Sequence, residues 1–243
     1  MYIEGRNAIL ESLRSNRQFK KLFAQDGVNK DEKVRQIVSK AKNRGVSIKY
    51  VTRKVLDKMS ITGVHQGFIA QVIDKEEMNL NQFIENKLRI DQNLFLVYIR
   101  DAQYDYNIGA IIRSAECAGA DGVILPPKIR IGAEAIRSST GAAEHINIFN
   151  ESLFNSIKTA QKTGVRIVGI EVTGEKYYYD EDLSGPVMFI VGGEDRPLSL
   201  EIQKKCDIIV KIPLRGKVNS LNMSVAAGIV MFEKTKQDLN NIN

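Results

Sequence analysis

Asn107 and Arg113 are the first residues of the chain whose types and spacing suggest chemistry. They lie in the stretch RDAQYDYNIGAIIRSAE, residues 100–116, which follows a continuous apolar run. Arginine presents a planar fork of donors that suits phosphate. Structural roles explain the same residues: Asn107 is suited to cap a helix, and Arg113 could pair with Glu116 at i, i+3. This stretch alone leaves both kinds of role open.

Gly192 and Glu194 lie in a second stretch of this kind, VGGEDRPLS at residues 191–199. Glycines allow a ligand to approach the backbone closely, and Glu194 follows directly on the end of an apolar, strand-like run. A tight turn with a solvated carboxylate is the competing interpretation. Taken by itself, the stretch is weak evidence for a site.

Ser220 and Asn222 lie in the third stretch, IPLRGKVNSLNMSVAAGIVMFE at residues 212–233. Either side chain can cap the helix that the following residues predict, and a glycine-containing loop before a helix presents unpaired N–H groups to a ligand. Apolar residues at three-to-four spacing predict one packing face, formed by Leu221, Val225, Ile229 and Phe232. An ordinary strand, loop and packing helix is the alternative interpretation.

The elements that must position these residues form an α/β protein. Residues 1–73 read as a small α/β unit with basic helix faces, and residues 74–93 as a polar linker followed by a short helix. Residues 94–243 alternate strands with helices, which predicts a parallel sheet covered on both faces. Ligands of such sheets bind beyond the carboxyl ends of the strands, so we expect the three stretches to converge there.

Composition limits the possible partners. The chain has 243 residues and a net charge of +6, which fits a polyanionic partner. It contains no run of about 18 apolar residues, and its N-terminus lacks a signal pattern, so we expect no membrane segment and a cytoplasmic location. The two histidines, His65 and His145, have no cysteine or carboxylate at ligand spacing, so we expect no metal.

Fingerprints of the commoner nucleotide-binding and hydrolytic enzymes are absent from the sequence. It has no dinucleotide-binding glycine pattern, no phosphate-binding loop and no nucleophile elbow. A dinucleotide oxidoreductase, a P-loop ATPase and a serine hydrolase are therefore disfavoured.

Taken together, the three stretches resemble the three motifs of the SpoU, or TrmH-type, RNA 2'-O-methyltransferases of the SPOUT superfamily. They match as NIGAIIRSAECAGADGVIL, FIVGGEDRPLS and IPLRGKVNSLNMSVAAGIVMFE. The segments EGRNAILESL and VHQGFIA resemble the substrate-binding domain of this family, which is related to ribosomal protein L30e. With SSTGAAEHINIF, they resemble the RlmB-like branch, which methylates a guanosine of 23S ribosomal RNA.

The resemblance implies a C-terminal domain with a deep trefoil knot, which binds S-adenosyl-L-methionine and pairs as a homodimer. Carried over by motif position, Gly192, Ile212 and Leu221 would contact the cofactor. The catalytic positions of the family match Asn107, Arg113, Glu194, Ser220 and Asn222. In the dimer, the arginine of one subunit would complete the site of its partner.

The implied activity is transfer of a methyl group to a ribose 2'-hydroxyl, with a guanosine of 23S ribosomal RNA as the substrate. The alternatives are a tRNA or other ribosomal RNA methyltransferase of the same family, and a non-catalytic RNA-binding protein with the same fold. One departure concerns Pro197, which stands where the family commonly has glycine. Proline has no amide N–H, so a cofactor contact through that amide is in doubt.

Overall fold

A computed structural model describes most of the chain, in two compact units. The described residues are 1–29, 31–75, 78–91, 93–101, 104–193 and 197–241. The first unit contains Met1–Glu76 and Ile131–His145, and the second contains Glu77–Arg130 and Ile146–Asn243. The segment Ile131–His145 therefore leaves the second unit and belongs to the first.

The first unit is built on a four-stranded sheet of order β1-β4-β2-β3. β4 is antiparallel to β1 and β2, while β2 and β3 are parallel. The apolar faces of α1 and α2 supply much of the core against this sheet. Its elements are β1 (Tyr2–Glu4), α1 (Arg6–Arg14), β2 (Phe19–Gln25), α2 (Glu32–Asn43), β3 (Ile48–Val51), α3 (Arg53–Met59) and β4 (Phe68–Val72).

The segment Ile131–His145 packs into the same core through α6 (Ala133–Ser138) and the short 3-10 helix η1 (Ala142–Glu144). Ile136 is 5% exposed and joins the apolar cluster of the first unit. Gly141 has φ 104°, and a Cβ there would stand 2.4 Å from Cγ of Glu11. Only glycine therefore allows this approach to α1.

The second unit contains a seven-stranded sheet of order β7-β6-β5-β10-β8-β11-β9, and every neighbouring pair is parallel. This confirms the predicted parallel sheet. The strands are β5 (Phe95–Ile99), β6 (Gly122–Leu125), β7 (Asn147–Asn150), β8 (Arg166–Ile170), β9 (Lys176–Tyr177), β10 (Val187–Val191) and β11 (Ile208–Lys211). The helices are α4 (Leu80–Ile90), α5 (Asp105–Cys117), α7 (Leu153–Lys162), α8 (Leu200–Gln203) and α9 (Met223–Asn241).

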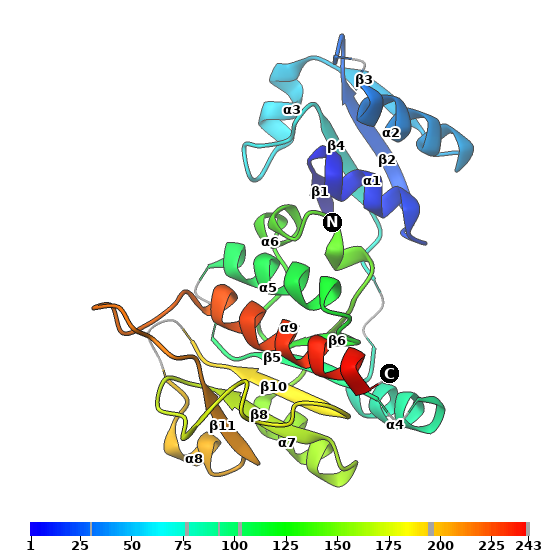
Figure 1. Cartoon of the computed structure of the whole chain (residues 1–243). Helices are drawn as coiled ribbons and strands as arrows, with labels where there is room; N and C mark the ends of the chain where they lie inside the picture. The colour runs from blue at the N-terminus through cyan, green and yellow to red at the C-terminus, as the bar shows by residue number, and fades with distance from the viewer. Residues whose placement is uncertain (30, 76–77, 92, 102–103, 194–196, 242–243) are drawn as a thin grey trace. The chain divides into compact units, whose positions relative to one another are not determined.

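Helices cover both faces of this sheet, with α5 and α9 side by side on one face and α7 and α8 on the other (Figure 1). β5 and β10 are buried along their whole length because both faces are covered. The predicted linker, residues 74–93, contains α4, whose Leu80 and Ile84 lie in the core of the second unit. Functional domain boundaries near residues 73 and 94 stay a prediction. No helix in the described part of the chain is long and apolar enough to cross a membrane.

A buried carboxylate, Glu4, holds the loop that precedes β4. Glu4 is 1% exposed, and its carboxylate accepts hydrogen bonds from Ser60 Oγ at 2.6 Å, Ile61 N at 2.6 Å and Thr62 Oγ1 at 2.7 Å. Burial by itself raises the pKa of Glu4, but these hydrogen bonds outweigh it and the pKa is lowered. The charged form is therefore the one that stabilises the fold.

We expect Glu4→Gln to destabilise the protein at neutral pH but to have a shrinking effect in acid. Hydrogen bonds to a charged group contribute about 1.5–3 kcal/mol, so a loss of this order is expected at pH 7. Because the folded pKa lies below the unfolded value of about 4.3, the contribution is present above that value and is lost as the pH falls through the folded pKa. Urea midpoints between pH 7 and pH 3 measure this, with Asp26→Asn, an exposed acid of the same unit, as control. A pH-independent difference between Glu4→Gln and wild type would contradict it.

Candidate functional site

A pocket of about 310 Å³ lies at the carboxyl ends of β8, β10 and β11. Four residues singled out in the sequence line it: Gly192, Ile212, Ser220 and Leu221. Apolar side chains form much of its wall, including Val172, Leu214 and Met223. The parallel sheet produces this convergence, because the loops that follow neighbouring strands leave at the same edge.

Glu171, directly after β8, is a pocket residue that the sequence analysis missed. Its Oε2 accepts a hydrogen bond from Leu198 N at 2.9 Å, and its Oε1 accepts one from Val172 N at 2.9 Å. A Cβ built on Gly192 would stand 3.4 Å from the same Oε2, so the glycine leaves that space to the pocket. A carboxylate at the end of a buried strand was the available signal, but nothing in the sequence marks its partners.

The hydrogen bonds around Pro197 show how the second loop is held. Its carbonyl accepts from Arg100 Nη1 at 2.8 Å, and the next amide, Leu198 N, is taken by Glu171. Leu198 is buried in the core cluster. The chain is thus held by the two polar backbone groups that directly follow the proline nitrogen, which itself has no hydrogen to donate. The helix that follows, α8, begins at Leu200.

Asn107 and Asn222 meet across the start of two helices. Asn222 Nδ2 donates to Asn107 Oδ1 at 3.1 Å, although 115 positions separate them in the chain. Asn222 Oδ1 also accepts from Ser224 N at 2.9 Å, so this side chain caps α9 as expected. The predicted N-cap role of Asn107 is wrong, because α5 begins at Asp105 after the N-cap Tyr104. Asn107 is instead 3% exposed within the helix.

Arg113 lies on α5 and its side chain is exposed. Its guanidinium makes no hydrogen bond or ion pair with another residue that the structure describes, so the pair with Glu116, one of the two roles that the sequence left open, does not form there. An exposed guanidinium keeps its donors available for an anionic ligand. Glu194, the remaining catalytic candidate, lies outside the described residues.

The predicted packing face of α9 is wrong, because two of its residues are about half exposed. Val225 is 50% exposed and Phe232 is 49% exposed. The helix instead buries the side that carries Met223, Ala227 and Val230. Apolar residues occur around most of this helix, so spacing alone does not select the buried side. An apolar stripe remains uncovered in the single chain.

No three His, Cys, Asp or Glu side chains gather at metal-binding distance among the residues that the structure describes. What the site offers is an apolar pocket rimmed by backbone groups, a capped helix start and an exposed arginine one helix away. Such a site can hold a mostly apolar ligand beside a polar one, and it can orient them through hydrogen bonds. This chemistry suits a group transfer between two bound molecules.

Fold and site together define an α/β protein with a ligand-sized pocket at the carboxyl edge of a parallel sheet, and a separate small α/β unit. Residues 94–232 match the model of the SpoU rRNA Methylase family. Residues 2–78 match the model described as RNA 2'-O ribose methyltransferase substrate binding. The chain therefore belongs to the SpoU family of RNA 2'-O-ribose methyltransferases.

Curated relatives agree over almost the whole chain. A putative TrmH family tRNA/rRNA methyltransferase, YacO, of Bacillus subtilis is 33% identical over 96% of this chain and 94% of its own length. A tRNA/rRNA methyltransferase of Mycolicibacterium smegmatis, described as uncharacterized, is 34% identical over 96% of this chain and 75% of its own length. The likeness thus includes both units.

Solved structures share the arrangement. An AdoMet-bound rRNA methyltransferase from Sinorhizobium meliloti is 25% identical, with TM-score 0.78, and the match covers 96% of this chain and 85% of that one. The SpoU methyltransferase AviRb from Streptomyces viridochromogenes, in complex with AdoMet, is 20% identical with TM-score 0.81, covering 99% of this chain and 91% of that one. At 20% identity, AviRb supports the fold alone.

Proposed function

We propose that this protein transfers the methyl group of S-adenosyl-L-methionine to the ribose 2'-hydroxyl of a guanosine in 23S ribosomal RNA. The observation that carries the proposal is the convergence of the three stretches singled out in the sequence. The stretches after β10 and β11 line one pocket. The stretch after β5 is joined to them by the hydrogen bond between Asn107 and Asn222. The knot that the resemblance implies, with the chain threaded from about Gly192 onward, is part of this proposal.

The pocket fits the proposed cofactor. Its volume of about 310 Å³ lies at the lower end of the range for small-ligand sites. Ile212 and Leu221 offer apolar surface for the faces of an adenine, while backbone groups near Gly192 offer hydrogen bonds to its edge. When bound, S-adenosyl-L-methionine supplies a methyl group already activated on a sulfonium.

Because the methyl group is activated by the cofactor, the protein mainly has to align the reacting oxygen and assist loss of its proton. We assign Arg113 to the RNA phosphate and to the negative charge that develops on the 2'-oxygen. A guanidinium remains protonated in proteins, which makes it a poor general base but a good electrostatic partner. Glu194, Ser220 and Asn222 position the ribose and the loops.

Ribosomal RNA is favoured over transfer RNA by the presence of the first unit. The rRNA methyltransferase of Sinorhizobium meliloti matches 96% of this chain. The tRNA-modifying TrmH/SpoU enzyme of A. aeolicus shares the fold over 65% of it, with 22% identity and TM-score 0.56. The net charge of +6 suits either RNA and does not distinguish them.

The uncovered apolar stripe of α9 supports the proposed homodimer. Val225 and Phe232 are about half exposed, and Leu221 at the pocket is 40% exposed. A contiguous exposed apolar surface on a soluble protein commonly marks a protein contact. Pairing through this stripe and the adjacent α5 would bring Arg113 of one subunit toward the site of the other.

The experiment that tests the proposal maps 2'-O-methylation in ribosomal RNA from cells with and without the gene. We expect one guanosine of 23S ribosomal RNA to lose its methyl group when the gene is absent. An unchanged 23S pattern with a change in transfer RNA or another ribosomal RNA would replace the substrate assignment. Calorimetry with S-adenosyl-L-methionine separates a methyltransferase from a pure RNA-binding protein, which should show no heat of binding.

A further inference from the structure

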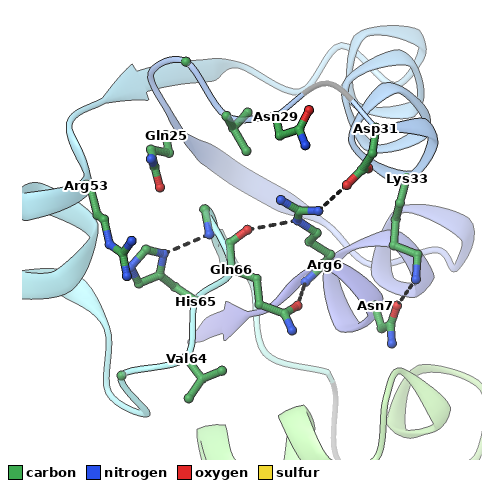
Figure 2. Close-up of a pocket in the computed structure, with 14 residues that line it drawn as sticks. Arg6, Asn7, Gln25, Asn29, Asp31, Lys33, Arg53, Val64, His65 and Gln66 are labelled. Carbon is green, nitrogen blue, oxygen red and sulfur yellow. Dashed lines mark hydrogen bonds and ion pairs between the residues drawn. The ribbon is translucent and has the colours of Figure 1, made fainter.

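The first unit contains a cavity of about 700 Å³ that is separate from the pocket of the second unit (Figure 2). Four parts of the first unit line it: the start of α1, described residues between the end of β2 and the first turn of α2, Arg53 at the start of α3, and residues 63–67 before β4. A cavity of this volume is within the range of small-ligand sites. Most of the side chains that line it are polar or charged, so the cavity is not a gap in the apolar core.

The floor of the cavity is buried and held in one arrangement. His65 is 5% exposed. Its Nδ1 accepts a hydrogen bond from Gly67 N at 3.0 Å, and its Nε2 lies 2.9 Å from Asp57 Oδ1. A backbone N–H can only donate, so Nδ1 carries no proton and Nε2 is the donor to Asp57. The imidazole therefore fixes the loop before β4 to α3.

Arg6 ties the start of α1 and the N-cap of α2 to this loop. Arg6 N donates to Gln66 Oε1 at 2.9 Å, and Arg6 Nε donates to the Gln66 carbonyl at 3.0 Å (Figure 2). Arg6 Nη1 pairs with Asp31 Oδ2 at 2.5 Å. Asp31 caps α2 by accepting from Val34 N at 2.9 Å. These bonds hold the lining segments in one arrangement, which lowers the cost of binding.

Gln66 has an unfavourable backbone conformation in this arrangement. Its φ of 52° makes it one of two non-glycine residues with positive φ in the described chain, the other being Thr140. Such a conformation costs on the order of 1–3 kcal/mol and persists where the surroundings impose it. The two Arg6 hydrogen bonds hold the side chain and the carbonyl of Gln66 in this conformation.

The rim of the cavity is cationic. Lys33 and Arg53 are exposed, and among the described lining residues they and Arg6 place three cations against one carboxylate, Asp31. Lys33 Nζ donates to Asn7 Oδ1 at 2.6 Å, which leaves the ammonium further donors. Arg53 has only a long contact of 3.9 Å to Asp57, and its side chain is 75% exposed. Both groups are therefore available to an anion.

Amide side chains complete the lining, and they can both donate and accept hydrogen bonds. These side chains are Asn7, Gln25, Asn29 and Gln66. A ligand that matches cations at the rim and amides inside carries a phosphate together with a flat, hydrogen-bonding group. A nucleotide has both, and the edges of its base are free for such contacts when it is unpaired and unstacked.

We propose that this cavity binds one unpaired nucleotide of the RNA substrate, with its phosphate at Lys33 and Arg53 and its base edge at the amides. The inference rests on the proposed function, since it assigns to the first unit a binding site for one nucleotide of the same RNA. It also predicts a preference for single-stranded over duplex RNA. A duplex keeps its base edges paired and stacked.

The test compares two double variants of equal charge change in the full-length protein. Lys33→Ala/Arg53→Ala removes the cavity cations, and Lys42→Ala/Lys54→Ala removes exposed lysines of the same two helices outside the cavity. Binding is measured with a 12-nucleotide single-stranded RNA of random sequence and with a duplex of the same length. We expect about tenfold weaker single-strand binding for the cavity variant only, and a salt slope lowered by about 0.7, since the two cations together neutralise one phosphate.

The outcomes separate this inference from the proposed function. Equal losses in both double variants, with wild-type methylation of ribosomal RNA intact, would overturn the cavity assignment alone. A wild-type protein that binds no RNA would overturn both. A nucleoside monophosphate that binds the wild type as tightly as the oligonucleotide would show that the cavity serves free nucleotides. Unchanged melting temperature and S-adenosyl-L-methionine binding in both variants establish that neither has lost its fold.

Discussion

Arg113→Ala is expected to reduce kcat/KM for RNA methylation by about 100-fold to 1000-fold while the melting temperature stays within a degree or two of wild type. The side chain is exposed on α5 and bonds to no other described residue, so its loss should cost less than about 0.5 kcal/mol of stability. Removing a group that stabilises developing charge commonly costs about 100-fold to 1000-fold in rate. Arg89→Ala, an exposed arginine on α4 of the same unit, is the matched control.

A conservative variant distinguishes the possible roles of Arg113. Lysine keeps the charge but lacks the planar fork, so Arg113→Lys should retain part of the rate with an unchanged pH profile if the role is electrostatic. If Arg113 acted as the base, the pH profile would shift with the identity of the side chain. Full activity in Arg113→Ala would remove this residue from the site.

Asn222→Ala is expected to lose about 100-fold in activity and about 2 kcal/mol or more in stability. The substitution removes the cap on Ser224 N, which accounts for about 1 kcal/mol. It also removes the Nδ2 donor to Asn107 Oδ1, a buried acceptor, which adds a cost of about 1 kcal/mol or more. Thermal unfolding and initial rates measure the two effects separately.

Asn222→Asp is the control that separates the helix-capping role of this side chain from its hydrogen bond to Asn107. Aspartate caps a helix as well as asparagine does, so stability at the start of α9 should be retained. It cannot donate to Asn107 Oδ1, so activity should still fall. Wild-type activity in Asn222→Asp would show that the bond to Asn107 is not needed for catalysis.

Mixing the two inactive variants tests whether a site is shared between subunits. If Arg113 of one subunit completes the site that contains Asn222 of the other, half of the randomly mixed dimers regain one site, and about a quarter of wild-type activity returns. If both residues act within one chain, no activity returns. Sedimentation of the wild type, compared with Phe232→Glu on the apolar stripe of α9, checks that the protein is a dimer.

The sequence by itself determined the parallel sheet and most of its helices. Continuous apolar runs such as Phe95–Ile99 and Val187–Val191 can be buried only in a sheet covered on both faces. It also located Gly192, Ile212, Ser220 and Leu221, which line one pocket because parallel strands end at a common edge. The sheet is a consequence of local pattern, which a sequence records directly, whereas the cofactor positions Ile212 and Leu221 were taken from the resemblance of the motifs to the SpoU family.

Short or edge elements were not determined by the sequence. β1, β7, β9 and α6 lack a long enough pattern, and each forms because a neighbour is already present. The segment Ile131–His145 is the largest case, since its place against α1 depends on the close approach that Gly141 allows. The local sequence does not indicate a packing partner that lies more than 100 positions away in the chain.

Only the tertiary structure decided which side of α9 is buried and which polar groups meet at the pocket. Spacing favoured the side with Val225 and Phe232, yet these remain about half exposed because apolar residues occur around most of the helix. The bonds from Asn222 to Asn107 and from Leu198 to Glu171 join residues far apart in the chain. Such contacts follow from the packing of whole elements, and that packing made three separate loops into one site.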